Sequence, residues 1–398
     1  MSFAILAGRN KPDEVIMALL TMLLFSDSRS SVLSFAQDAK VVAVLIFSLY
    51  GIFNKQFFRT GLSAVSLNFL PFLVYGLLAT LWSDIPFTAF QKSLSYALVF
   101  LLVPSVSSYC FREVPRFRVD LSIYFTIVLL VGVALYFVLP DFVIFVGRFR
   151  GLLGNPNGLG LYLLLSTAVT LSLYAKYDHR FSKGVYTMFM VLFFISLIAC
   201  GSRTALMAVL FYVVFSRFTA VPHFLVLLMF FAMILSYEYV LQELPKWIIQ
   251  LNLQDYLRLD TLSEGSGRFI AWNFAWQNIN DVYFLGGGFG YTDKIYQDAY
   301  RQLSLLGHQG NAHNSYLTLW LDTGVIGLSL FAMGLIRNIT QATARYRFAL
   351  VLLMSVLLST YFESWLAASL NPFTSLFLIL LTVLIEVPEE DEAPLKPV

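Results

Sequence analysis

The chain has few charged residues for its length. Only 13% of its 398 residues are Asp, Glu, Lys or Arg, whereas a soluble domain carries about 25%. This scarcity of charge excludes a water-soluble globule. The net charge is +2, and the positive residues are spread through short loops rather than gathered into a stripe, so nothing indicates a nucleic-acid partner.

Cysteine and histidine are also scarce. Cys110 and Cys200 lie in apolar surroundings, and the topology below places them at opposite membrane faces, which excludes a disulfide on distance. The four histidines are accompanied by no cysteine cluster and no regular acidic spacing. The sequence therefore predicts no metal site and no cofactor.

Apolar runs take the place of the missing charge. Hydrophobic residues make up 58% of the chain, and runs approaching the ~20 residues needed to cross a bilayer recur along it. We predict an all-α, polytopic membrane helical bundle that forms a single transmembrane domain over residues 1–388. About twelve transmembrane helices are expected, at 14–26, 40–54, 62–82, 92–110, 119–139, 158–175, 184–200, 204–216, 223–240, 314–336, 348–363 and 372–386.

The distribution of Lys and Arg predicts the orientation. With the N-terminus inside, every inside loop is basic, which favours both termini in the cytoplasm. No cleavable targeting signal is convincing, so the first helix is expected to be retained. Residues 389–398 are then a short acidic cytoplasmic tail, and the one long polar interval, residues 241–313, lies outside.

The long outside loop is expected to contain short amphipathic helices. Phe269, Trp272, Trp276 and Ile279 repeat at helical spacing and predict one apolar face. Arg268 would stand in the first turn, where a cation opposes the helix dipole and needs an anionic partner. Glu264 and a phosphate are the two alternatives. The glycines from 286 to 290 would expose backbone N–H groups, although such clusters more often mark a flexible turn.

Three further arginines lie outside, against the charge bias. Arg148 and Arg150 precede the turn Asn155-Pro156-Asn157-Gly158. This turn either caps the next helix through Asn155 or Asn157, or also forms an anion site with the arginines. Arg203 joins two apolar helices with almost no loop, so it either snorkels to headgroups or provides a fixed cation in a cavity.

His313 is the candidate general base. We expect it in the first turn of the tenth predicted helix, beside Asn311 and Asn314. The positive end of the helix dipole would disfavour its imidazolium form, and a neutral ring can accept a proton. A helix cap at the interface is the structural alternative. Asp322, deeper in the same helix, is a functional candidate, or pairs structurally with a basic residue or a Thr hydroxyl.

Several ordered motifs carry a family resemblance. They are Arg150-Gly151, Asn155-Pro156-Asn157, Leu159-Gly160, Gly201-Ser202-Arg203-Thr204-Ala205, Gly267-Arg268 with Trp272, Gly288-Phe289-Gly290, and His313-Asn314-Ser315-Tyr316-Leu317 with Gly324 and Gly327. Together with Trp82-Ser83-Asp84-Ile85-Pro86 they span roughly residues 82–330. The set resembles the bacterial O-antigen ligase and polymerase family.

The resemblance implies a fold, a reaction and a location. The fold is a GT-C-type bundle in the bacterial inner membrane. The reaction moves a glycan from undecaprenyl pyrophosphate to an acceptor sugar on the periplasmic side, without a metal and with inversion. Membrane lipids surround the protein. Arg203 and Arg268 would hold the pyrophosphate and His313 would serve the acceptor hydroxyl. The remaining predicted substrate contacts are Arg148, Arg150, Asn155, Asn157, Asn314, Tyr316 and Asp322.

The sequence does not identify the acceptor of the glycan. A ligase would use lipid A-core and a polymerase the growing O-antigen or exopolysaccharide, with the same donor chemistry; the sequence leans towards a ligase. A lipid-linked sugar transporter or flippase is the alternative from another class. Against it, a transporter should place charges near the midplane, whereas most charges here cluster at one face.

Overall fold

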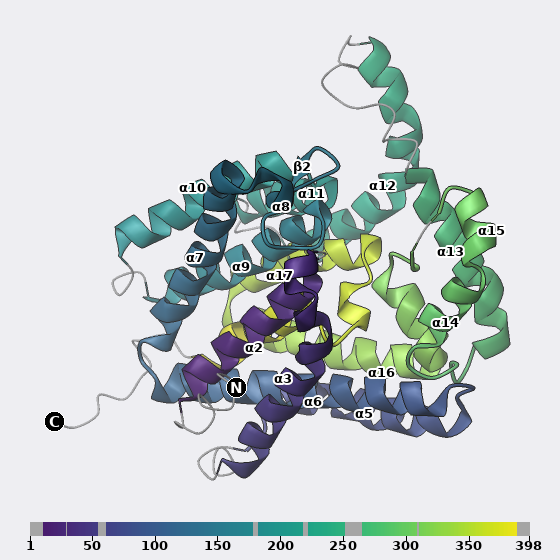
Figure 1. Cartoon of the computed structure of the whole chain (residues 1–398), viewed down its shortest axis with the longest axis horizontal. Coiled ribbons are helices and arrows are strands. Elements are labelled where there is room, and N and C mark those ends of the chain that lie inside the picture. Colours follow the sequence, from purple (N-terminus) through teal and green to yellow (C-terminus); the bar gives the residue numbers. More distant parts are fainter. Residues whose placement is uncertain are drawn as a thin grey trace.

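The computed structural model describes residues 11–28, 30–54, 61–177, 182–217, 222–250, 265–308 and 310–387. Nearly all of these residues are helical (Figure 1). The described strands are β1 (Ile144–Phe145) and β2 (Arg148–Phe149), which pair antiparallel in a small hairpin. The predicted all-α class is therefore confirmed.

All twelve predicted helices are present. They are α2 (Pro12–Asp27), α3 (Phe35–Phe53), α5 (Ala64–Leu78), α6 (Pro86–Glu113), α7 (Phe117–Val138), α9 (Pro156–Tyr177), α10 (Lys183–Cys200), α11 (Arg203–Ser216), α12 (His223–Gln250), α16 (Ser315–Arg345), α17 (Arg347–Phe362) and α18 (Pro372–Glu386). Their apolar composition and the polar breaks between them made each one recognisable in the sequence.

Four helix boundaries differ from the prediction by five residues or more. Helix α3 begins at Phe35 and not at residue 40, and helix α16 continues to Arg345 and does not end at residue 336. Helix α6 begins at Pro86 and not at residue 92, because proline is well suited to the first helical turn, where no backbone donor is lost. Helix α12 continues to Gln250, so the expected loop does not begin at residue 241. The predicted acidic tail, 389–398, lies outside the described residues.

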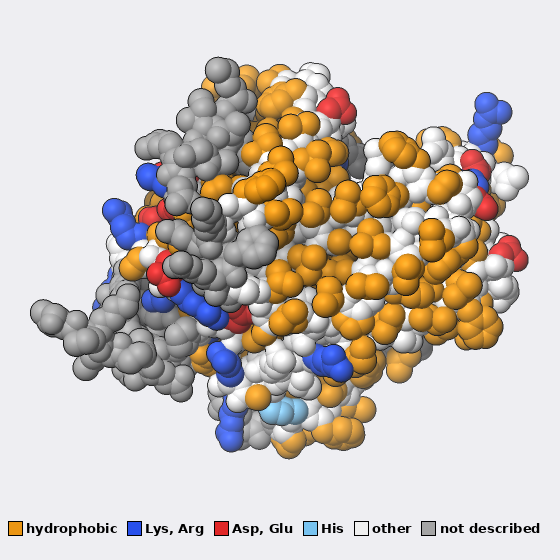
Figure 2. Space-filling model, turned by 90° about the horizontal axis from the view of Figure 1, so that it is seen from below, with side chains coloured by type: hydrophobic (Ala, Val, Ile, Leu, Met, Phe, Trp, Pro, Cys, Tyr) orange, Lys and Arg blue, Asp and Glu red, His pale blue; other side chains and the backbone are white. Residues whose placement is uncertain are grey.

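Seven helices are long and apolar enough to cross a membrane: Ser31–Phe53 with its short 3-10 start, Ala64–Trp82, Pro86–Glu113, Phe117–Val138, Pro156–Lys176, Lys183–Cys200 and Ser315–Arg345. Four shorter apolar helices accompany them: Arg203–Ser216, His223–Ser236, Arg347–Phe362 and Pro372–Glu386. Figure 2 shows a broad apolar surface with most charged side chains towards its edges. These features are those of a polytopic membrane protein.

The C-terminal helices form the centre of the bundle. From Pro372 to Ile385 every residue of α18 is buried, and most of α17 is buried as well. An aromatic cluster joins α5, α6 and α16, with the ring of Phe69 5.1 Å from Phe100 and 5.4 Å from Phe331. Cys110 and Cys200 are both buried and free, as expected.

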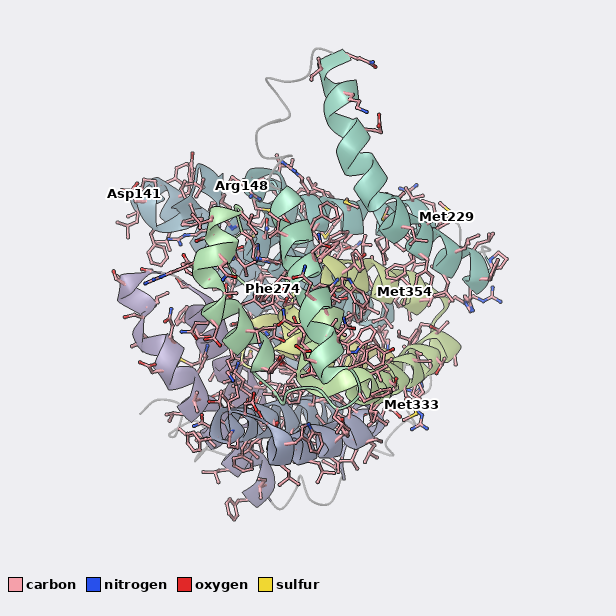
Figure 3. All side chains as sticks on the ribbon, turned by 90° about the vertical axis from the view of Figure 1, so that its right-hand side faces the viewer. Asp141, Arg148, Met229, Phe274, Met333 and Met354 are labelled. Atoms are coloured by element: carbon pink, nitrogen blue, oxygen red, sulfur yellow. The ribbon has the colours of Figure 1, made fainter. Side chains whose placement is uncertain are left out.

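The long polar interval is largely helical in its described part. It contains α13 (Gly265–Ile279), a 3-10 turn (Asn280–Val282), α14 (Tyr291–Asp298) and α15 (Tyr300–Leu305). These helices gather at one end of the bundle, beside the start of α16, on the right of Figure 1. In the end view of Figure 3, Phe274 of α13 lies near the centre, with Arg148 above it. This end carries the candidate site.

Candidate active site

Glu363, directly after α17, is the centre of a polar cluster. Its Oε1 accepts from Nη2 of Arg268 at 3.0 Å and from Nδ2 of Asn157 at 3.3 Å. Nδ1 of His313 lies 3.5 Å from its Oε2. The three partners come from α13, α9 and the segment before α16. Folding therefore brings together residues that are far apart in the sequence.

The Glu363 carboxylate is held in its charged form. Burial by itself raises the pKa of Glu363, but the hydrogen bond with His313 and the positive charge of Arg268 outweigh burial, so the net pKa lies below its usual value. Only 15% of the Glu363 side chain is exposed. A buried carboxylate is therefore ionised at neutral pH, next to a guanidinium and an imidazole.

His313 is fixed in an uncommon backbone conformation. Its φ is 45°, in the left-handed region that non-glycine residues rarely adopt. The backbone N–H donates to Oδ1 of Asn311 at 2.9 Å, and the next residue, Asn314, donates its N–H to Oγ of Ser364 at 3.0 Å. The α16 helix begins at Ser315. His313 therefore precedes the helix, which corrects its expected place in the first turn.

These contacts determine which ring nitrogen is available. A carboxylate oxygen can only accept, so Nδ1 of His313 carries the proton that faces Glu363. In the neutral ring, Nε2 is then the acceptor. One third of the His313 side chain is exposed. A carboxylate that holds Nδ1–H orients the ring and leaves Nε2 as the nitrogen that could accept a proton.

Arg148 contacts this cluster, and Arg203 follows the end of α10, which Arg148 also contacts. Arg148 donates from Nη2 to Oδ1 of Asn157 at 3.3 Å and from Nε to the carbonyl of Cys200 at 2.8 Å. It thus joins the polar cluster to the end of α10. Arg203 is the first residue of α11, two residues beyond Gly201, and is exposed. Asn157 links Arg148 to Glu363, so the predicted arginines and His313 share one end of the molecule.

Arg150 and Asn155 have structural roles. Arg150 is 7% exposed and donates to the carbonyls of Phe142 at 3.1 Å and Gly154 at 3.4 Å. Asn155 accepts from the N–H of Gly158 at 2.8 Å, the contact of an N-cap. The N-cap that both interpretations of this turn include is thus observed, and we leave both residues out of the proposed substrate contacts.

Asn314 and Tyr316 also face the protein. Oδ1 of Asn314 accepts from the backbone N–H groups of Tyr316 and Leu317 and caps α16. The hydroxyl of Tyr316 accepts from Thr360 of α17 at 2.9 Å. Both residues position His313 through the helix start rather than by facing an open surface.

Asp322 anchors the start of α14. It is buried and accepts from the N–H of Gly290 at 3.1 Å and from the N–H and hydroxyl of Thr292 at 2.8 and 2.7 Å. These bonds use both carboxylate oxygens. The Thr pairing was one of the two readings of Asp322, and the structure favours it over substrate binding.

The glycine cluster is threaded into a break in α16. Gly324 has φ 66° and ψ −179° inside this helix. At the break, the N–H of Val325 donates to Tyr283, and Gly287 and Gly288 donate to Leu321 and Asp322. The N–H groups of Gly286, Gly287 and Gly288 therefore donate to backbone carbonyls, and that of Gly290 donates to the Asp322 carboxylate, so these groups are not available to an anion. A Cβ at Gly286 would meet Gly324 N at 2.4 Å, so only glycine fits.

The buried face of α13 differs from the prediction. Ala271, Ala275 and Ile279 are buried, whereas Trp276 is 51% exposed. Ala271 and Ala275 belong to one buried cluster with Tyr296 of α14 and with Leu317 and Leu321 of α16. The hydroxyl of Tyr296 also donates to the carbonyl of Ala271 at 2.6 Å. Of the two partners considered for Arg268, Glu264 lies outside the described residues; the observed partner is Glu363.

Sequence reasoning missed Glu363. Its signal was an acidic residue at the outer end of an apolar helix, on the side where the other charges were arginines. An ionisable group at the edge of hydrocarbon requires a partner, and His313 and Arg268 were already placed there. The local sequence around Glu363 shows no motif, so the pairing becomes visible only in three dimensions.

The helices and this polar cluster define a polytopic membrane protein with a base and several cations at one end. A family model described as O-antigen ligase matches residues 188–332. Over this segment the chain is similar to the O-antigen ligase family. The matched residues include Arg203, Arg268 and His313, whereas Arg148, Asn157 and Glu363 lie outside them. A comparison with curated proteins gave no match.

Proposed function

We propose that this protein transfers a glycan from a polyprenyl pyrophosphate to the hydroxyl of an acceptor sugar. The family match supports membrane glycan transfer of the ligase or polymerase type. The observation that carries the site assignment is the pairing of Arg268 and His313 with one carboxylate, at 3.0 and 3.5 Å. This pairing supports assigning His313 as the proton acceptor and Arg268 as the phosphate-binding cation.

His313 activates the acceptor. Nε2 takes the proton from the sugar hydroxyl, while Glu363 holds Nδ1–H and stabilises the imidazolium that forms. The deprotonated oxygen attacks the anomeric carbon, and the bond from that carbon to the phosphate oxygen breaks. Attack from the face opposite the leaving group inverts the anomeric configuration.

Arg268 and Arg203 receive the leaving group. The electron pair of the broken bond departs with the pyrophosphate, which is already a good leaving group and needs only its growing charge neutralised. Two guanidinium groups can do this without a metal ion. A guanidinium carries five N–H donors, so the bond from Arg268 to Glu363 is compatible with phosphate binding.

The proposal also specifies the carrier lipid of the donor and the membrane face on which the site lies. The donor carrier is undecaprenyl, whose chain would lie between apolar helices while the pyrophosphate sits at the interface. The Lys and Arg bias favours cytoplasmic termini and a periplasmic site in the inner membrane. The acceptor is lipid A-core for a ligase, which we favour, and a growing polysaccharide for a polymerase.

The test is transfer by purified protein in liposomes that contain lipid-linked glycan and acceptor. We expect transfer by the wild type and none by His313→Ala or Arg268→Ala. Arg301→Ala is the matched control, because Arg301 is exposed on α15 at the same end. Wild-type rates in either site variant would remove that residue from the mechanism. Movement of donor across the bilayer without any transfer would instead identify a flippase.

A deletion strain distinguishes ligase from polymerase. Full-length polymer left on the carrier indicates a ligase, whereas core capped with a single repeat indicates a polymerase. A lipopolysaccharide gel reads out both results.

A further inference from the structure

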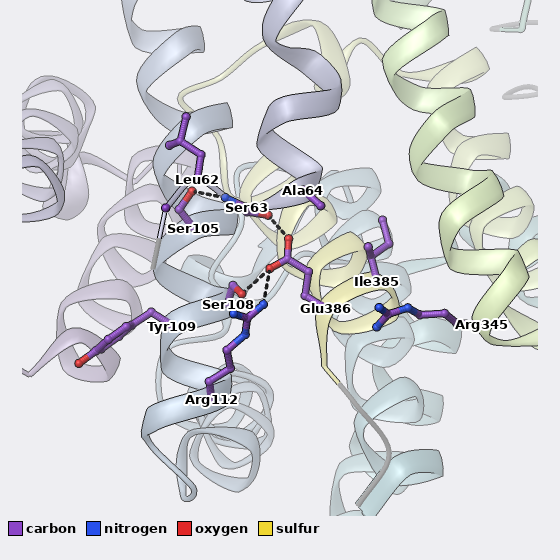
Figure 4. A pocket seen from close by; sticks show the side chains of 11 residues that line it. Leu62, Ser63, Ala64, Ser105, Ser108, Tyr109, Arg112, Arg345, Ile385 and Glu386 are labelled. Atoms are coloured by element: carbon purple, nitrogen blue, oxygen red, sulfur yellow. Dashed lines mark hydrogen bonds and ion pairs between the residues drawn. The ribbon is translucent and has the colours of Figure 1, made fainter. Parts of the chain in front are cut away.

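A polar cavity lies at the other end of the bundle, formed by four helix ends. Its volume is about 230 Å³, and it is lined by residues of the start of α5 and the ends of α6, α16 and α18 (Figure 4). Helix α16 begins at Ser315, two residues after His313 of the candidate active site, and its last residue, Arg345, lines this cavity. The two sites therefore lie at opposite ends of α16 and are separate.

Glu386 forms the floor of this cavity. Its side chain is only 7% exposed. The hydroxyls of Ser63 and Ser108 donate to its two oxygens, and Nη2 of Arg112 lies 3.5 Å from Oε2. A carboxylate has about four acceptor positions. Glu386 can therefore accept further N–H donors from a ligand.

Two guanidinium groups border the carboxylate. Arg112 and Arg345 both line the cavity and lie on opposite sides of Glu386 in Figure 4. The side chain of Arg112 is 49% exposed, and Arg345 is exposed. Within the described ranges, no hydrogen bond or ion pair engages the Arg345 side chain. The cavity therefore offers a buried negative group beneath accessible positive groups.

Leu62 and Ile385 complete the wall. They give the cavity an apolar side at the ends of membrane-spanning helices, where lipid headgroups meet the protein. The volume is below the range of about 300–1,000 Å³ typical of drug-sized ligand pockets. These features suit a compact polar group attached to an apolar chain.

We propose that this cavity binds the headgroup of a phospholipid that carries a phosphate and a primary ammonium, as in phosphatidylethanolamine. The ammonium donates to Glu386, and the phosphate accepts from Arg112 and Arg345. A choline headgroup has no N–H to donate, and a glycerol headgroup brings no cation to Glu386. The proposal is independent of the glycan-transfer reaction.

Native mass spectrometry of the purified protein with matched acyl chains tests this. We expect phosphatidylethanolamine to be retained more strongly than phosphatidylcholine or phosphatidylglycerol. Glu386→Gln should lower its affinity about tenfold, as expected for losing a hydrogen bond to a charged group. Equal retention of the three lipids, or preference for phosphatidylglycerol, would overturn the proposal.

Arg345→Gln is a second variant that should fold normally, because this exposed side chain makes no hydrogen bond or ion pair with another described residue. It should lower the affinity for phosphatidylethanolamine, whereas Arg347→Gln, at the same end but outside the cavity lining, should not. Equal effects of the two variants would contradict the site. Soluble phosphoethanolamine should bind more weakly than the lipid; equally tight binding would overturn the assignment to a lipid.

Discussion

His313 and Glu363 are 50 residues apart in the sequence, yet Nδ1 of His313 lies 3.5 Å from Oε2 of Glu363. The other oxygen of the same carboxylate is 3.0 Å from Nη2 of Arg268. One buried acid therefore connects the proposed base with a proposed phosphate-binding cation. Several consequences of this connection can be measured.

Replacing Glu363 by Gln should slow transfer while leaving the protein folded. The amide keeps the size of the side chain but removes the charge that stabilises the imidazolium of His313. We expect kcat to fall about 10²-fold, at the low end of what general-base catalysis contributes, with a smaller change in the acceptor KM. Single-turnover transfer in liposomes measures this effect. Unchanged turnover would show that the acid does not assist the base.

The same pair should make stability depend on pH. The pKa of Glu363 is lower in the folded protein than in the unfolded chain, so ionisation of this group stabilises the fold. That contribution is fully present above the unfolded pKa of about 4.3 and is lost as pH falls through the lowered folded pKa. The wild type should therefore melt above Glu363→Gln at neutral pH, with the gap closing in acid. Thermal scans in detergent at constant scan rate test this, and a gap that persists in acid would contradict it.

The fold was largely predictable from the sequence because each membrane helix can be recognised from its own stretch of residues. Each needs a continuous apolar run, and the breaks between runs are polar. Arg268 and His313 could also be found from local patterns, because Arg268 precedes a stretch with helical spacing and His313 directly precedes an apolar helix. Their presence at one end followed from the alternation of the helices.

The details of the site depended on contacts that no local pattern encodes. Glu363 meets Arg268 across 95 residues and His313 across 50. Helical spacing placed Trp276 on the apolar face of α13, but the buried face of this helix contains the small Ala271 and Ala275 instead. Asp322 resembled a functional acid, although its partners lie on α14, about 30 residues earlier in the chain.

The break in α16 should not tolerate a side chain at Gly286. The position has φ 74°, and a Cβ there would meet Gly324 N at 2.4 Å and Asp322 O at 2.5 Å. Gly307 is a matched control, with φ 89° and nothing within 4 Å of its Cβ position. Gly307→Ala should cost only backbone strain, about 1–2 kcal/mol, and Gly286→Ala about 1–3 kcal/mol more from overpacking. Equal melting temperatures of the two variants would show that the glycine segment in the break of α16 can shift to accommodate a Cβ at Gly286.

Asp322→Asn tests whether this acid supports the structure or contacts the substrate. The variant leaves one oxygen to serve three donors, and its amide NH₂ would face backbone N–H or hydroxyl groups that also donate. We expect stability to fall by about 1.5–3 kcal/mol, the contribution of a hydrogen bond to a charged group, while the folded fraction keeps the wild-type KM for the donor. Asp293→Asn is the control, because Asp293 is 64% exposed in its ion pair with Lys92, and such surface pairs contribute about 0–1 kcal/mol. A raised KM without a change in melting temperature would return Asp322 to the substrate site, since only a ligand contact affects binding without affecting the α14 junction.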